Sequence, residues 1–255
     1  MRILALPFLL VATSVGAQEA PGGNYVSFEF GVGVQNAPSY FGAEDSDLAM
    51  SGAFLNPSLS IGSLAFGQGS DAYGLGATGS FRIVNERTAA ANLELGGLAD
   101  IDMAIEVGGG LTYSTQNSEV FAVGRYGVVG HNGWVGEIGG DYIIQPSDHV
   151  ELRVGPRLFF GDDTYSNTYF GVDAAGAASL TSSSDSVVDA FDAKGGLLSR
   201  GIEVSAEYSF NDNWGLVGTV NYDTLLNDAA KSPIVQTTDQ LGVSLIVTRK
   251  VTWSF

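Results

Sequence analysis

The feature that most constrains this chain is a regular alternation of apolar and polar residues, with a period of two, that recurs along its length. In residues 202–210 every second residue is apolar, and the residues between them are Glu203, Ser205, Glu207 and Ser209. The same pattern occupies residues 26–34 and 150–160. Such alternation indicates β-strands with one apolar face, and about nine to eleven residues is the length of a tilted strand that crosses a membrane.

Turn residues separate these runs and give an approximate strand count. Polar turns at 131–133, 146–148 and 211–213, and longer links at 35–49, 85–97, 180–195 and 227–240, mark the boundaries. Strands are predicted at 25–35, 51–66, 72–84, 100–114, 119–129, 134–144, 150–160, 168–179, 196–210, 214–226 and 241–255. Bacterial barrels usually have an even number of strands, so we predict an all-β fold, a closed antiparallel transmembrane β-barrel of about 12 strands, with 10 as the alternative.

The eleven predicted strands are odd in number, so one strand has been missed or wrongly divided. A strand missed by the pattern would lie within 36–50 or 180–195, and a short helix is expected within 85–95. A soluble β-sandwich is the competing fold. Its aromatic residues would lie mid-strand, whereas Trp134 and Trp214 lie at strand ends, as the interfacial rings of membrane barrels do.

Composition agrees with strands that face lipid. Charged residues are 15% of the 255 residues, against roughly 25% in an ordinary soluble domain, and the chain has 35 glycines. The formal net charge of −17 argues against nucleic acid as a partner, because phosphate binding needs clustered lysine and arginine. The absence of cysteine excludes disulfides and a thiolate metal site.

The N-terminus is typical of a cleavable export signal. Arg2 supplies the basic region, residues 3–15 form an apolar core, and small residues follow at 15–17. We therefore predict a signal peptide over 1–17 and an outer-membrane barrel domain over 18–255. The predicted location is the outer membrane of a Gram-negative cell, with its lipid as one partner.

The last predicted strand carries the most specific signal. Apart from Arg249, one of its faces is apolar, and it ends in Trp253 and Phe255. A terminal phenylalanine on an amphipathic strand resembles the signal read by the barrel assembly machinery, which is therefore a predicted partner during biogenesis. Counted from the end of the chain, Arg249 is expected on the lipid-facing side near mid-bilayer, where an arginine costs about 2–4 kcal/mol.

The sequence offers few candidates for catalytic or metal-binding residues. His131 lies in a predicted turn, and His149 follows Asp148, but adjacent strand residues point to opposite faces, so this pair makes a poor dyad. Acidic groups at 44–47, at 162–163 and at positions 185, 189 and 192 do not match a calcium-binding loop. The sequence predicts no catalytic residue, no metal and no cofactor, and a barrel hydrolase is the least favoured function.

Charges of both signs occupy the predicted inward faces. They are Glu29, Glu119, Arg125, Glu137, Asp141, Glu151, Arg153, Arg157, Glu203 and Glu207. Two interpretations remain open at this point. The charges line a lumen that passes small solutes, or they form ion pairs inside a narrow barrel, since barrels of intermediate size lie between filled and open ones.

Four short segments occur in a recognisable order. They read Pro-Ser-Tyr-Phe-Gly at 38–42, Gly-Leu-Ala-Asp-Ile-Asp at 97–102, Tyr-Phe-Gly-Val at 169–172, and Asp-Ala followed by Ser-Pro-Ile-Val within 228–235. Together with Phe255 they resemble the MipA/OmpV family of outer-membrane proteins, although Ala99 replaces a glycine of the family pattern. The family positions are Pro38, Tyr40, Gly42, Gly97, Asp100, Asp102, Tyr169, Phe170, Gly171, Asp228, Ser232 and Pro233.

This resemblance implies a barrel without catalytic residues. The namesake of the family is understood as a scaffold that links a murein-degrading lytic transglycosylase, MltA, to a bifunctional penicillin-binding protein. The resemblance therefore predicts a scaffold in peptidoglycan turnover, with those two enzymes as partners. A small porin-like diffusion channel is the alternative. Short turns offer little surface to a partner, which weighs against the scaffold.

Overall fold

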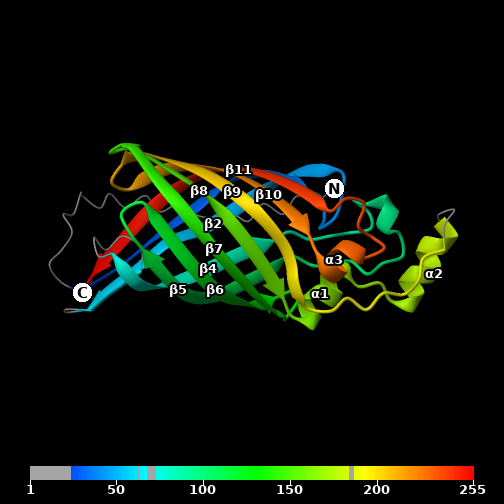
Figure 1. The fold of residues 1–255 in the computed structure, drawn as a ribbon. Coiled ribbons are helices and arrows are strands. Elements are labelled where there is room, and N and C mark those ends of the chain that lie inside the picture. Colours follow the sequence, from blue (N-terminus) through cyan, green and yellow to red (C-terminus); the bar gives the residue numbers. More distant parts are fainter. Residues whose placement is uncertain (1–23, 62–63, 68–72, 184–186) are drawn as a thin grey trace.

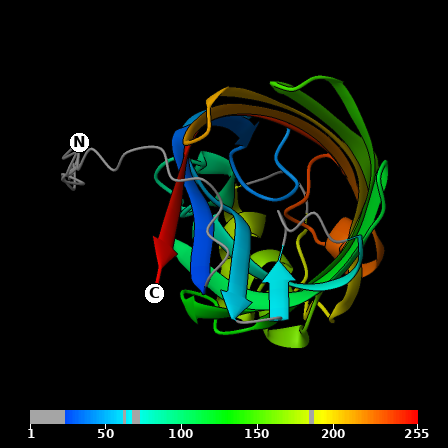
Figure 2. The same cartoon turned by 90° about the vertical axis from the view of Figure 1, so that its left-hand side faces the viewer.

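The computed structural model describes residues 24–61, 64–67, 73–183 and 187–255, and the predicted signal peptide lies outside them. They form one antiparallel sheet that curls around an interior, with the helices gathered at one end (Figures 1 and 2). The strands are β1 (Tyr25–Pro38), β2 (Ser46–Ile61), β3 (Leu64–Gly67), β4 (Gly74–Val84), β5 (Ala104–Ser114), β6 (Ser118–Val129), β7 (Trp134–Ser147), β8 (Val150–Gly161), β9 (Gly196–Asn211), β10 (Trp214–Leu225) and β11 (Asp239–Ser254).

The strand order corrects the predicted count. The sheet has eleven strands in the order β3-β2-β1-β11-β10-β9-β8-β7-β6-β5-β4, and neighbours are antiparallel. β3 and β4 follow one another in the sequence and run in the same direction, but they lie at opposite edges of the sheet. If the two are counted as a single strand, the chain passes along the barrel wall ten times. Twelve strands are not found among the described residues. The edges touch where β4 packs against β2 and β3, but no hydrogen-bonded ladder joins them within the part of the chain described.

The predicted strand at 168–179 is wrong, because this segment is helical. α1 (Asp163–Phe170) begins after Asp162, whose Oδ1 accepts a hydrogen bond of 2.8 Å from the Tyr165 N–H. α2 (Ala174–Ser183) begins after Asp173, whose Oδ1 accepts one of 2.7 Å from the Gly176 N–H. An aspartate that caps the first turn, followed by alanines with high helix propensity, stabilises a helix over a strand.

The other links also differ in part from expectation. The link at 36–50 hides no separate strand, because β2 simply begins earlier than expected, and the strand predicted at 51–66 is divided between β2 and β3. A short 3-10 helix, η1 (Leu93–Leu95), lies in the segment where a short helix was expected. α3 (Asn227–Lys231) lies in the last long link. No helix in the described part is long and apolar enough to cross a membrane.

The two faces of the sheet follow the predicted alternation. On β11 the side chains of Leu241, Val243, Leu245 and Val247 are exposed, whereas Ile246 and Thr248 are buried. Exposed apolar residues continue around the outside on β1, β5, β9 and β10, among them Phe30, Val32, Leu111, Ile202, Val204, Val220 and Tyr222. A continuous exposed apolar surface of this kind marks contact with lipid and is what a membrane barrel presents outwards.

Arg249 interrupts this apolar surface beside an aromatic ring. Its register partner on β10 is Trp214, the first residue of that strand, and its guanidinium lies 5.2 Å from the centre of the Trp214 ring. Arg249 is therefore level with the end of its neighbouring strand. A cation over an indole face is stabilised by about 0.5–1 kcal/mol at exposed sites, so the tryptophan offsets part of the cost of this charge.

The two ends of the barrel differ in the length of their connections. Tyr25 pairs with Ser254, so both ends of the described chain lie together, beside the short turns at 115–117, 148–149 and 212–213. The opposite end carries the connections 39–45, 85–103, 130–133, 162–195 and 226–238, with the three α-helices of the described residues (Figure 1). Most of the irregular structure in the described part of the chain is therefore concentrated at one mouth.

Candidate functional site

The five connections at the helical mouth pack on one another and form what we call the cap. Two clusters of buried apolar residues hold it together. The first contains Ile101, Val135, Tyr165, Tyr169, Phe170, Ala193, Leu198, Leu225 and Ala229. The second contains Tyr40, Ala43, Leu95, Val172, Ala177, Leu180 and Ile234. Since each cluster draws on several connections, the cap is a small core of its own on top of the barrel.

The family positions of the first and last connections meet in the cap. The Tyr40 hydroxyl donates a hydrogen bond of 3.2 Å to the Ile234 carbonyl, over 194 residues of sequence. The carbonyl of Gly42 accepts from the N–H groups of Gln236 and Thr237. Gly42 has φ +96°, and a Cβ there would lie 2.5 Å from Val235 Cγ2, so both its conformation and its surroundings require glycine.

The family segment at 169–171 lies at the centre of the cap. The Ser232 hydroxyl donates a buried hydrogen bond of 2.5 Å to the Phe170 carbonyl, and Arg87 Nη1 donates one of 3.2 Å to the Tyr169 carbonyl. The ring of Phe41 meets that of Tyr169 edge-on, with centroids 5.2 Å apart. This segment therefore joins the first, second and last long connections.

The other family positions have mostly local roles. Gly97 has φ +96°, and a Cβ there would overlap Ser179, while Asp100 Oδ1 accepts from the Ala89 N–H at 2.9 Å. Gly171 ends α1, and Pro38 ends β1. Asp228 accepts from the Lys194 N–H and from the Lys231 ammonium, which lower the pKa of its carboxyl. Asp102 and Pro233 are exposed, as are Trp253 and Phe255 at the other end.

Burial in the cap raises the pKa of three tyrosines. Burial raises the pKa of Tyr165 to about 12. Burial, with a further contribution from Glu94, raises the pKa of Tyr40 to about 12. Burial also raises the pKa of Tyr169. A phenol whose folded pKa exceeds its unfolded value near 10 contributes stability that is complete below pH 10 and is lost as the pH rises through about 12.

We therefore expect the cap to open between about pH 10 and 12. In an absorbance titration of tyrosinate, the exposed tyrosines should ionise first, and the three cap tyrosines should ionise together with loss of protease resistance in the cap. The Tyr169 hydroxyl is buried without a hydrogen-bond partner, so Tyr169→Phe should shift the opening to higher pH, whereas Tyr73→Phe, at an exposed position, should leave it unchanged. Smooth titration of all ten tyrosines near pH 10 would contradict this expectation.

Beneath the cap, Glu106 is the centre of a buried ion-pair network. Its side chain is 0% exposed and pairs with Arg82 Nη2 at 2.6 Å and with Arg125 Nε at 3.0 Å. His131 Nε2 lies 3.2 Å from the same carboxylate, while His131 Nδ1 accepts a hydrogen bond from the Gly133 N–H. Sequence reasoning missed Glu106 and Arg82, although the alternation in 100–114 places Glu106 on an inward face.

The network continues down the lumen through two further arginines. Arg157 pairs with Asp141 at 2.8 Å and with Glu203 at 2.9 Å, and Arg153 pairs with Glu151 at 2.7 Å and with Glu119 at 3.2 Å. Arg125 Nη2 also pairs with Glu137 at 3.0 Å. Of the two interpretations of the inward charges, the structure favours ion pairs, which link neighbouring strands from β4 to β9 along the inward face of the sheet.

Neither histidine is placed for nucleophilic catalysis. The partners of His131 are Glu106 and a backbone N–H, and His149 Nδ1 lies 3.1 Å from the Ser209 carbonyl oxygen. Among the described residues no hydrogen bond links either ring to a hydroxyl nucleophile, and no group of three or more His, Asp or Glu side chains is arranged to hold a metal. Asp162 and Asp163 serve instead as backbone acceptors near α1.

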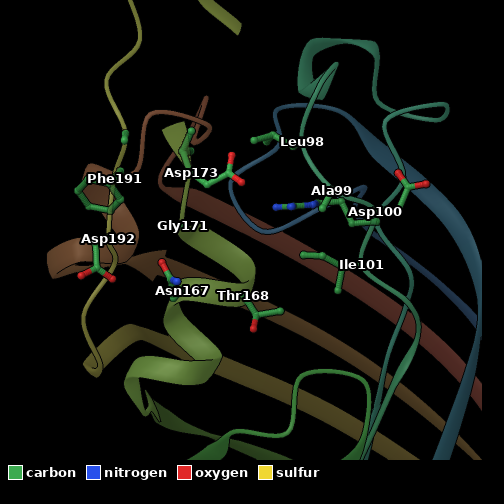
Figure 3. A pocket seen from close by; sticks show the side chains of 13 residues that line it. Leu98, Ala99, Asp100, Ile101, Asn167, Thr168, Gly171, Asp173, Phe191 and Asp192 are labelled. Atoms are coloured by element: carbon green, nitrogen blue, oxygen red, sulfur yellow. The ribbon is translucent and has the colours of Figure 1, made fainter. Parts of the chain in front are cut away.

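A hollow of about 580 Å³ opens on the cap between the 85–103 connection and the segments that flank α1 and α2 (Figure 3). Arg87, Asn167, Thr168 and three aspartates provide its polar lining, and Leu98, Val172 and Phe191 are among its apolar residues. Two family positions, Asp100 and Gly171, lie in this lining.

Solved structures of several outer-membrane proteins are similar to this chain at low identity. Neisserial surface protein A is 9% identical and has a TM-score of 0.30, with 92% of this chain and 99% of that chain covered. The outer membrane channel DcaP of Acinetobacter baumannii is 9% identical with a TM-score of 0.36, covering 93% and 100%. The Pseudomonas putida toluene transporter TodX is 9% identical with a TM-score of 0.31, covering 92% and 90%.

Sequence comparison identifies the family of the chain. No curated protein sequence matches the chain significantly. The family model described as MltA-interacting protein MipA matches residues 30–251, a span that includes most of β1, most of β11 and the whole cap. The resemblance seen in the four short segments is thereby confirmed, and with its lipid-facing sheet this protein belongs to the MipA family of outer-membrane barrels.

Proposed function

We propose that this protein is a non-catalytic scaffold that holds a murein-degrading lytic transglycosylase at the outer membrane and links it to a murein synthase of the penicillin-binding class. The observation that supports a scaffold over a diffusion channel is that the interior of the barrel is obstructed. One mouth is covered by the cap, and below it the ion-pair network around Glu106 lines the inward face of strands β4 to β9. The family's description as MltA-interacting protein supplies the partner class.

The partner surface that we propose is the rim opposite the cap. In outer-membrane barrels the short turns face the periplasm, where murein lies, and the longer loops face outwards. The turns at 115–117, 148–149 and 212–213 and the ends of β1 and β11 make up this rim. Asp148 and Asp212 are exposed there, so an enzyme with a basic docking patch fits it.

The test is direct binding with folded protein in lipid nanodiscs. We expect a purified MltA-type transglycosylase and a bifunctional penicillin-binding protein to bind together, and the double change Asp148→Lys/Asp212→Lys to weaken binding at least about tenfold through charge reversal. Asp102→Lys in the cap is the matched control and should leave affinity unchanged. If neither enzyme binds, the scaffold proposal fails for this protein.

A small diffusion channel is the second candidate function. It is supported by inward-facing acidic residues that take no part in the ion-pair network. Within the described part of the lumen, Glu207 and Asp223 lie on inward faces without an ion pair to any described residue. Such carboxylates would attract small cations. Recording in planar bilayers decides between the two functions, because a scaffold gives no conductance steps and a channel gives cation-selective steps.

A further inference from the structure

The hollow on the cap has a nearly buried arginine with unused donors. Arg87 is 7% exposed, and its Nη1 donates to the Tyr169 carbonyl at 3.2 Å. Among the described residues its Nε and Nη2 have no hydrogen-bond partner, and no carboxylate lies within ion-pair distance of the guanidinium. Burial lowers the pKa of Arg87 accordingly. These N–H groups can donate to a ligand in the hollow that Arg87 lines.

Three carboxylates line the same hollow, and each has one oxygen engaged in the fold. Oδ1 of Asp100 accepts from the Ala89 N–H, Oδ1 of Asp173 accepts from the Gly176 N–H, and Oδ2 of Asp192 pairs with the Lys194 ammonium. The second oxygen of each has no partner among the described residues. The backbone N–H groups thus hold Asp100 and Asp173 in position, Asp192 pairs with an exposed lysine, and each carboxylate retains acceptor capacity on its second oxygen.

The rest of the lining combines an aromatic ring with small polar groups. Phe191 is held by a two-way backbone bridge to Val172, with N–O distances of 2.7 and 2.8 Å. Asn167 and Thr168 lie on the last turn of α1, and Figure 3 shows their side chains together with those of Asp173 and Asp192 around the opening. The Thr168 hydroxyl donates to the Thr164 carbonyl, so its own oxygen remains an acceptor.

The mixture of donors, acceptors and an aromatic ring in this lining favours one class of ligand. An anion would face three carboxylates, and a cation would leave the donors of Arg87 unmatched. A neutral polyhydroxyl ring satisfies both, because each hydroxyl both donates and accepts, and its C–H face packs on an aromatic ring. We propose that the hollow is a binding site for a neutral saccharide unit, with Arg87 as donor, Asp100 and Asp173 as acceptors and Phe191 as the stacking surface.

The site lies at the mouth opposite the rim proposed for the murein enzymes, so the two proposals are independent and fail separately. The test uses full-length protein in nanodiscs of defined phospholipids, applied to an array of neutral, acidic and amino-sugar oligosaccharides. We expect binding to neutral glycans. Competition by lipopolysaccharide would indicate a glycan of the cell's own envelope as the source, and binding that resists this competitor would indicate an external glycan.

Two variants connect binding to the hollow. Asp173→Asn retains an N-cap acceptor for α2 but removes the charge, and should weaken binding about tenfold, as expected for the loss of a charged acceptor. Arg87→Gln should abolish binding, with the folded state checked by heat-modifiable migration on gels. Asp102→Asn, an exposed acid of the same connection outside the hollow, should have no effect. Absence of neutral-glycan binding, binding of acidic or amino sugars alone, or binding unchanged in Asp173→Asn would overturn the proposal.

Discussion

Replacing Glu106 by glutamine is expected to lower the free energy of unfolding of the barrel by about 3–5 kcal/mol. The substitution keeps the size of the side chain but removes the only charge that faces Arg82 in an ion pair within the described residues. Arg125 is 5% exposed and keeps only its pair with Glu137. The buried guanidinium of Arg125 and the half-buried one of Arg82 lose a shared carboxylate, and the loss of one member of a buried pair is costly because the remaining charge stays desolvated.

Equilibrium unfolding by urea in liposomes, followed by tryptophan fluorescence, measures this change. Glu151→Gln is the matched control. Glu151 lies in the same network but is 24% exposed, and its partner Arg153 keeps Glu119 at 3.2 Å. We expect the control to cost about 1 kcal/mol or less. Equal losses for the two variants would show that Glu106 is not the centre of the network.

The sequence predicted the outward surface of the barrel well, because that surface depends on a local pattern. Lipid selects apolar residues at every second position, so the exposed faces of β9 and β11 followed directly from the alternation. The same alternation misled at 168–179, where two capping aspartates produced helices. A period of two over a few residues does not exclude a helix, and only the caps distinguish the two there.

The interior was harder to predict because its contacts depend on register. Arg82 and Glu106 are opposite one another only when β4 and β5 pair as they do, and Arg125 reaches the same carboxylate from β6. The preferred count of 12 strands was not confirmed for a related reason: β3 and β4 divide one crossing between two edges of the sheet, which leaves the ten crossings of the alternative count. The family segments were found in sequence order, but their common place in the cap depends on contacts such as Tyr40 with Ile234, 194 residues apart.

Alanine at Gly108 or Gly110 is expected to destabilise the barrel by about 1–3 kcal/mol at each position, through overpacking. These glycines alternate on the inward face of β5, where β6 lies unusually close. A Cβ on Gly108 would overlap the Gly124 carbonyl oxygen and lie 2.7 Å from Arg125 Cα, and one on Gly110 would overlap the Ala122 carbonyl oxygen and lie 2.6 Å from Val123 Cα. The opposing atoms are backbone, so no side chain can rotate away to make room.

The position of these two glycines also explains why a glycine-rich segment occurs on a strand. Glycine in a strand permits close backbone approach, and here the approach brings Arg125 over Glu106. The same urea titration should therefore show lower stability for Gly108→Ala and Gly110→Ala. Gly124→Ala, on the adjacent strand, is the control, because its Cβ would meet nothing nearer than the Val135 carbonyl oxygen at 3.9 Å. If Gly124→Ala were as destabilising as Gly108→Ala, the cause would be the general loss of glycine from strands and not close approach at β5.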